Sequence, residues 1–307
     1  MTKALDRRRF VQGGLAAAWA LGVVASNAAA PQLADAIEPI KRPGAAKFKF
    51  SLAAYSYRDL LSGKNMRLTM ADFVRECARF GLDGTELTSY YFPKELTKEY
   101  LLSIKKLCFE LGLDISGTAV GNDFGHPEGE KRRQQVELVK RWVDHAAVLG
   151  APVIRVFAGH AQPGSTPAEA HRLMVAGLEE CCDYAGQQGV FLALENHGGP
   201  TATAAGLLEF VRDVKSPWFG VNVDTGNFHS QDIYAELEQV APYALNVQVK
   251  VVVTGADGKK QPSDYARLAK MLRAVGYRGY IVLEYEEPGD PPVECAKHLE
   301  SLRAAFA

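Results

Sequence analysis

Four polar residues stand where apolar side chains would otherwise pack. Glu195, Asp224 and Glu284 each follow a short apolar run, and Gln248 lies inside a fourth run. Carboxylates placed in apolar surroundings are costly unless paired or metal-bound, and several that converge need a cation between them. Each residue alone could equally cap the loop after it, but four in succession favour a site for one divalent ion. Oxygen ligands of this kind suit Mn²⁺ or Mg²⁺, with Co²⁺ or Zn²⁺ less expected.

Such a site could abstract a proton next to a carbonyl group. A metal ion polarises the carbonyl and holds adjacent oxygens, while a positioned carboxylate acts as the base and an enediolate forms. Two carboxylates on opposite sides of one carbon could remove and return the proton on different faces, which gives epimerisation. Lys250 follows Gln248 by one side-chain alternation and could reach the same oxygens, although a structural ion pair is the alternative.

The elements that must position these residues alternate between short β-like runs and longer amphipathic stretches. This pattern predicts βαβ units and a parallel sheet. The expected strands are Phe48–Ala54, Leu82–Leu87, Asp114–Ala119, Pro152–Phe157, Val190–Glu195, Trp218–Val223, Leu245–Val251 and Tyr280–Glu284. The expected helices are Thr69–Phe80, Leu96–Leu111, Lys131–Leu149, Pro167–Gln188, Ala202–Val214, Ile233–Ala241, Ser263–Ala274 and a last one from Pro292 onward.

Eight consecutive βα units without a break in composition favour an α/β fold of the (β/α)₈ TIM-barrel type, as a single domain over residues 48–307. In such barrels the chemistry lies at the carboxyl ends of the strands. The four polar residues stand at or near predicted strand ends, so barrel geometry would bring them together.

The mature chain resembles the xylose isomerase-like sugar phosphate isomerase/epimerase superfamily of TIM barrels. The segments that carry the resemblance, in this order, are Ser51–Tyr57, Gly84–Pro93, Leu194–Gly199, Asp224–Asn227 and Val282–Glu284. Each segment is a moderate signal, and their order is the specific one.

The resemblance implies roles for the four polar residues. Glu195 and Glu284 look like the two carboxylates that contact the metal and transfer a proton, and Asp224 looks like a third ligand. Many relatives have a His-x-His-x-Lys pattern, whose second His is the fourth ligand. Here the pattern is Asn246-Val-Gln248-Val-Lys250, so Gln248 takes the ligand position with an amide oxygen. This difference leaves the affinity and the identity of the metal open.

Further candidates for binding a substrate lie at or just past the predicted strand ends. Each has a structural alternative: a rim salt bridge or cap for the charged residues, a solvated loop position for two of the histidines, and core packing for the tyrosine. These candidates are Lys250, His197, His229, Glu86, Arg155, His160 and Tyr57.

The amino terminus predicts an export signal. Asp6-Arg7-Arg8-Arg9-Phe10 precedes an uncharged stretch and then small residues near Ala28 and Ala30, which resembles a twin-arginine (Tat) signal peptide over residues 1–30. A disordered tail or an uncleaved anchor is the alternative. Residues 31–47 are expected to be a linker. The mature protein would then be periplasmic or otherwise exported, with the Tat machinery as a partner and without stable membrane insertion.

Composition narrows the choice of function. A formal net charge of -1 over 307 residues gives no reason to expect nucleic acid as a partner. The five cysteines form no CxxC pair, so neither a zinc knuckle nor a disulfide framework is predicted. A small sugar is the expected substrate, and the sequence leaves a homo-oligomer open.

The leading hypothesis is a divalent-metal-dependent isomerase or epimerase of a sugar or keto-sugar. A lyase of 3-keto-glycosides would use the same proton abstraction and is the alternative among enzymes. A non-catalytic exported sugar-binding barrel is the alternative from another class, but it would need no pair of proton-transfer carboxylates.

Overall fold

A closed ring of parallel strands forms the centre of the protein. The computed structural model describes residues 37–307, so the predicted signal peptide and residues 31–36 of the predicted linker lie outside the described part. Eight strands form one sheet in the order β1-β10-β7-β6-β5-β4-β3-β2, and each paired neighbour runs parallel. A parallel bridge between Ala53 and Glu86 joins the first strand to the last in this order. The predicted (β/α)₈ barrel is confirmed.

The strands of the barrel are short and largely buried, as expected for parallel strands covered by helices. Their bounds are β1 Lys47–Leu52, β2 Gly84–Thr88, β3 Asp114–Ala119, β4 Val153–Val156, β5 Phe191–Glu195, β6 Phe219–Asp224, β7 Ala244–Lys250 and β10 Arg278–Glu284.

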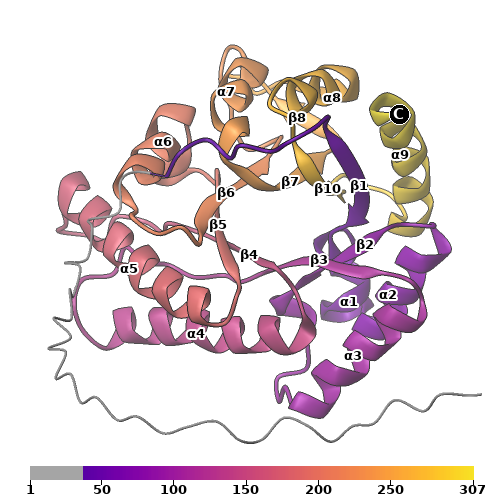
Figure 1. The fold of residues 1–307 in the computed structure, drawn as a ribbon, viewed down its shortest axis with the longest axis horizontal. Helices are drawn as coiled ribbons and strands as arrows, with labels where there is room; N and C mark the ends of the chain where they lie inside the picture. The colour runs from indigo at the N-terminus through magenta and orange to yellow at the C-terminus, as the bar shows by residue number, and fades with distance from the viewer. Residues whose placement is uncertain (1–36) are drawn as a thin grey trace, which may run out of the picture. The chain divides into compact units, whose positions relative to one another are not determined.

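Helices lie outside the ring of strands (Figure 1). Most begin after a Thr or Asp whose side chain accepts a hydrogen bond from a backbone N–H of the first turn. The glycines that follow helices in the sequence, such as Gly81 and Gly150, have positive φ. The helix bounds are α1 Arg58–Leu61, α2 Met70–Arg79, α3 Lys98–Glu110, α4 Glu130–Leu149, α5 Pro167–Gln187, α6 Ala204–Asp213, α7 Ile233–Val240, α8 Tyr265–Ala274 and α9 Pro291–Phe306.

An antiparallel ribbon follows β7 and was not predicted. It pairs β8 (Val252–Thr254) with β9 (Lys260–Pro262). Its strands have three residues each, too few to give an alternating pattern in the sequence. The ribbon forms part of the rim above β7.

Residues 37–46, part of the predicted linker, contact the barrel. The backbone N–H of Ile40 donates to the carbonyl of Pro242 at 3.0 Å, and Arg42 donates to the carbonyl of Ala244 at 2.6 Å. Across residues 37–307, no helix combines the length and the apolar character that crossing a membrane requires.

Candidate active site

Three carboxyl-bearing residues end neighbouring or near-neighbouring strands of the barrel. Glu195 ends β5, Asp224 ends β6 and Glu284 ends β10. In the sheet register Asp224 is opposite Gln248, and Glu284 is opposite Lys250 at the end of β7. All five side chains are buried. The structure therefore brings the candidates of β5, β6, β7 and β10 to one rim of the barrel.

The ammonium group of Lys250 lies among three carboxylates. Its Nζ is 2.5 Å from Glu284 Oε1, 2.8 Å from Glu286 Oε1 and 3.2 Å from Asp224 Oδ2. Glu284 and Glu286 accept hydrogen bonds from it, whereas Asp224 Oδ2 is an ion-pair contact and makes no hydrogen bond. Glu286, two residues beyond the end of β10, was not predicted as a site residue. The Glu-x-Glu spacing that begins at Glu284 was the available signal.

Glu195 has a different cation beside it. Its Oε2 lies 2.9 Å from Arg155 Nε, and its Oε1 accepts a hydrogen bond from Asn227 at 2.9 Å. Arg155 comes from β4 and also donates to the carbonyl of Val120 at 3.0 Å. Of the two explanations for Arg155, substrate binding or a salt bridge at the rim, the structure places it in a salt bridge to Glu195.

Below this rim, Gln248 belongs to a buried network of amides around Glu86. Its Nε2 donates to Glu86 Oε1 at 2.6 Å, and its Oε1 accepts from Asn222 at 2.6 Å. Asn246 donates to Glu86 Oε2 at 2.7 Å. Asn222 and Asn246 were missed in the sequence. Both stand two positions before a candidate, Asp224 or Gln248, so the two-residue period of a strand places them on the same inward face.

Burial determines the ionisation of the carboxyl groups. Loss of hydration raises the pKa values of Glu86, Glu195, Asp224 and Glu284 to about 7 in each case. For Lys250, burial alone would lower the pKa, but Asp224 and Glu284 raise it well above its ordinary value. A carboxyl group with a pKa near neutrality can both accept and return a proton at neutral pH.

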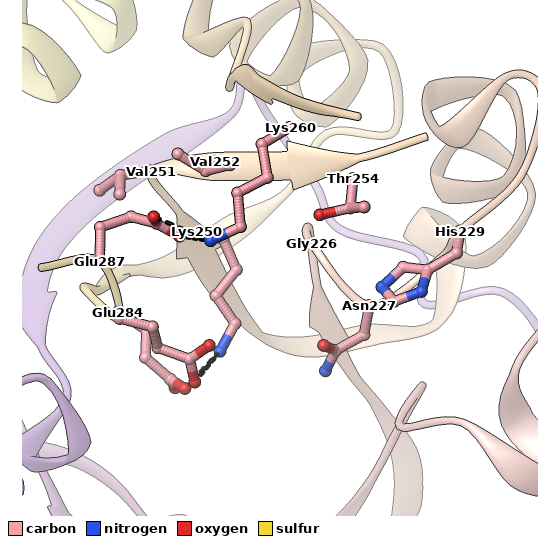
Figure 2. Close-up of a pocket in the computed structure, with 11 residues that line it drawn as sticks. Gly226, Asn227, His229, Lys250, Val251, Val252, Thr254, Lys260, Glu284 and Glu287 are labelled. Carbon is pink, nitrogen blue, oxygen red and sulfur yellow. Dashed lines mark hydrogen bonds and ion pairs between the residues drawn. The ribbon is translucent and has the colours of Figure 1, made fainter. Parts of the chain in front are cut away.

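A cavity of about 270 Å³ opens above Lys250 (Figure 2). Glu284 and Lys250 form one side of the cavity, and Asn227 and His229 lie across from them. The ribbon contributes Thr254 and Lys260, and Lys260 pairs with Glu287 at 2.8 Å. The residues around the cavity include both signs of charge and side chains that can hydrogen-bond the hydroxyl groups of a small molecule.

The remaining predicted binding residues lie in different places. His229 is exposed and lines the cavity, and His197 packs on Phe157 with ring centroids 4.3 Å apart. His160 is exposed, and its Nδ1 is 3.7 Å from Asp123. Tyr57 is fully buried against Phe73 in the hydrophobic core, so its position matches the packing alternative and not a contact with substrate.

The donor set does not fit the predicted divalent ion. Within residues 37–307, no group of three or more His, Cys, Asp or Glu side chains is arranged to hold a metal. Glu195 is paired with Arg155, and the Lys250 ammonium contacts both Asp224 and Glu284. The amide of Gln248 is bound to Glu86 and Asn222 instead of facing these carboxylates. A resident cation of the protein therefore stands beside each carboxylate that was predicted as a ligand.

A family model supplies the relationship of the chain to known proteins. The model, described as xylose isomerase-like TIM barrel, matches residues 74–305. The chain belongs to the xylose isomerase-like TIM barrel family. The resemblance of the sequence to this family is thus confirmed, while the Tat signal stays a prediction.

Solved structures show the same fold as this xylose isomerase-like barrel at low sequence identity. D-psicose 3-epimerase with D-tagatose from Clostridium cellulolyticum H10 has a TM-score of 0.69 and 15% identity, over 84% of this chain and 99% of that one. A xylose isomerase domain protein from Planctomyces limnophilus has a TM-score of 0.64 and 19% identity, over 86% and 98%. The 3-keto-D-glucoside 4-epimerase from E. coli has a TM-score of 0.64 and 17% identity, over 84% of this chain and 99% of that one. The search of curated proteins gave no match.

Proposed function

We propose that this xylose isomerase-like barrel is an isomerase or epimerase of a neutral sugar or keto-sugar. The observation that carries the proposal is the placement of two buried carboxyl groups, Glu195 and Glu284, at the ends of two strands, each beside its own cation. The two structural neighbours named as epimerases act on a ketohexose and on a keto-glucoside, which supports this substrate class. Mixed charges at the cavity, without a cluster of free cations, suit a hydroxylated substrate better than a phosphorylated one.

In the proposed reaction, a proton leaves one face of a carbon next to a carbonyl, and another proton is added to the opposite face. One carboxylate of the Glu195 and Glu284 pair takes the proton from carbon, and the electron pair moves to the carbonyl oxygen. The other group of the pair, starting as the acid, then delivers its proton to the opposite face as the electron pair returns. Protons and electrons balance, and the two carboxyl groups exchange protonation states in each turnover. Buried cations near the oxygen would stabilise the enediolate charge.

We further propose that the enzyme works outside the cytoplasm. The support for this location comes from Arg7, Arg8 and Arg9 and the uncharged stretch after them, because export signals combine a cationic segment with a short apolar one. Free sugars and oxidised glycosides outside the cytoplasm would then be the available substrates.

Solvent deuterium exchange tests the proposed reaction. The purified chain is incubated in D₂O with a panel of ketohexoses and 3-keto-glycosides, and label at each carbon is followed by NMR. We expect deuterium at one carbon next to the carbonyl, and a loss of about 100- to 10,000-fold in the exchange rate for Glu195→Gln or Glu284→Gln, as for removal of a general acid or base.

The matched control is Glu180→Gln, because Glu180 also pairs with a lysine, Lys140 at 2.7 Å, but on the outer helices. This variant should keep the exchange rate of the wild type. A wild type that binds sugars without exchange would indicate the sugar-binding barrel, and release of an aglycone along with exchange would indicate the lyase.

A further inference from the structure

Lys250 is held in a site that is built around it. Its ammonium is shared among Glu284, Glu286 and Asp224 at 2.5, 2.8 and 3.2 Å, and its side chain is 9% exposed. The Asp224 side chain is fully buried. Burying a carboxylate here without a cation beside it would be unfavourable. Lys250 therefore supplies positive charge in the space where carboxylates from two strands converge.

The backbone around Lys250 fixes where its side chain begins. The backbone N–H of Lys250 donates to Thr225 Oγ1 at 3.0 Å, and its carbonyl accepts from Ser263 Oγ at 2.5 Å. Thr225 follows β6 and Ser263 follows β9, so the contacts hold Lys250 from both sides. These two hydrogen bonds fix the backbone from which the Lys250 side chain extends to the carboxylates.

Gly226 leaves the space that the lysine side chain occupies. A Cβ at this position would lie 2.5 Å from Lys250 Cγ and 2.9 Å from its Cβ. Contacts this short do not occur between non-bonded carbon atoms, so any larger residue would displace the aliphatic chain of the lysine. The Asp224-Thr-Gly-Asn227 segment thus provides both a carboxylate partner for the ammonium and the room for its chain.

The other candidate ligands have partners that keep them from completing a metal site. Arg155 and Asn227 occupy the two oxygens of Glu195, and Glu86 and Asn222 occupy the amide of Gln248. A divalent ion between Asp224 and Glu284 would also lie against the ammonium of Lys250 and be repelled by it.

We propose that the ammonium of Lys250 is the resident cation of this barrel, in the place where the sequence predicts a divalent metal ion. The wild-type protein then binds no divalent ion at this site. Lys250 also lines the cavity, so its ammonium could contact an oxygen of a ligand bound there. This last consequence, stabilisation of an enediolate oxygen by Lys250, rests on the proposed function, whereas the occupation of the cation position does not.

Metal binding in the absence of any sugar tests the proposal. The purified wild type is treated with a chelator and dialysed, and its binding of Mn²⁺ is measured by calorimetry and by elemental analysis. The same is done for Lys250→Met, which keeps an unbranched side chain without the charge, and for Lys140→Met, which removes a lysine from the exposed pair with Glu180.

We expect no stoichiometric Mn²⁺ in the wild type or in Lys140→Met. In Lys250→Met, Asp224 and Glu284 lose the competing charge, and we expect the affinity for Mn²⁺ to rise about 100-fold or more. One Mn²⁺ per chain in the wild type would overturn the proposal, as would a folded Lys250→Met that gains no affinity. If Lys250→Met does not fold, Mn²⁺ binding by the wild type alone tests the proposal. Failure of sugar exchange would count against the proposed function and leave this result untouched.

Discussion

At the scale of single residues, the balance between buried carboxylates and buried cations sets the properties of the rim. Arg155 and Glu195 are both buried, and their closest atoms are 2.9 Å apart. The guanidinium also donates to Tyr90 at 3.4 Å and to a backbone carbonyl. Removing one member of such a pair leaves a charge in the protein interior without compensation, which costs far more than loss of an exposed pair.

At a pH well above 7, where Glu195 is ionised, replacement of Arg155 by methionine should therefore lower the free energy of unfolding by about 3–5 kcal/mol. The double variant Arg155→Met, Glu195→Gln should recover most of that loss, because no charge is then left unpaired. Urea denaturation of the wild type, both single variants and the double variant gives the coupling directly. The exposed Arg212, paired with Asp213, is the control, and Arg212→Met should cost less than about 1 kcal/mol. If the loss of unfolding free energy in the double variant equals the sum of the losses in the two single variants, the compensation argument is wrong.

Residue types alone identified the rim carboxylates but not their partners. Glu195, Asp224 and Glu284 were visible in the sequence because each ends an apolar run. Which cation would pair with which carboxylate depends on the register between β4 and β5 and between β7 and β10. The pattern of residue types in one sequence carries no information on that register. The sequence therefore suggested a metal ion where the structure places Lys250.

At the scale of elements, helix ends and strand ends were predictable and short irregular segments were not. The predicted strand Asp114–Ala119 matches β3 residue for residue, and most other predicted ends differ by one or two residues. The ribbon of β8 and β9 was missed because its pairing depends on a turn at Gly255 and Gly258 and not on hydrophobic alternation. Yet this ribbon contributes to the cavity wall, so part of the specificity of the site lies in a segment without a readable motif.

The capping box of α2 gives a prediction for a single element. Thr69 accepts from the backbone N–H of Asp72 at 3.2 Å, and Asp72 accepts from the Thr69 hydroxyl at 2.7 Å and from its N–H at 3.0 Å. Hydrogen bonds from Thr69 hold the pKa of Asp72 below its ordinary value of 3.8. The carboxylate thus contributes stability above that value and loses it as the pH falls through the lowered pKa.

Thr69→Ala should lower the free energy of unfolding by about 1 kcal/mol at neutral pH. The difference from the wild type should shrink as the pH falls below 3.8, because Asp72 becomes protonated in both proteins. Thr203 is the control, because it caps α6 by accepting from Gly206 and has no acidic residue in the first turn after it. Thr203→Ala should have a similar cost that does not change over this pH range. Chemical denaturation at several pH values checks both, and a constant cost for Thr69→Ala would disprove the role of Asp72.

At the scale of the whole molecule, the order of βα units in the sequence was sufficient to predict the barrel. Eight apolar runs separated by amphipathic stretches have few compact arrangements, and a closed parallel barrel buries all of them. The rim chemistry is less determined, because the same fold accommodates either a metal ion or an ammonium group between its carboxylates. The fold therefore locates the site, and the residues Lys250, Gly226 and Gln248 decide what fills it.

The cysteines give a prediction for the barrel as a whole. All five are free and buried, and they lie under different helices around the ring: Cys77 on α2, Cys108 on α3, Cys181 and Cys182 on α5, and Cys295 on α9. Burial raises the pKa values of Cys108, Cys181 and Cys295 to about 12, and it also raises those of Cys77 and Cys182. Since the thiolate is the reactive form, these thiols should be inert in the folded protein.

Labelling of the native protein with a disulfide reagent should therefore modify none of the five cysteines, and labelling in denaturant should modify all of them. Because the five thiols are distributed over four helices around the ring, exposing all of them requires the barrel to open as a whole. Their reaction rates should then rise together with urea and follow the global unfolding curve. Mass spectrometry of samples partly labelled at a reagent concentration where labelling is faster than refolding resolves this, since concerted opening then yields chains with no label or with five. A population in which Cys295 alone is modified would instead show that α9 detaches from β1 and β10 while the rest of the barrel stays closed.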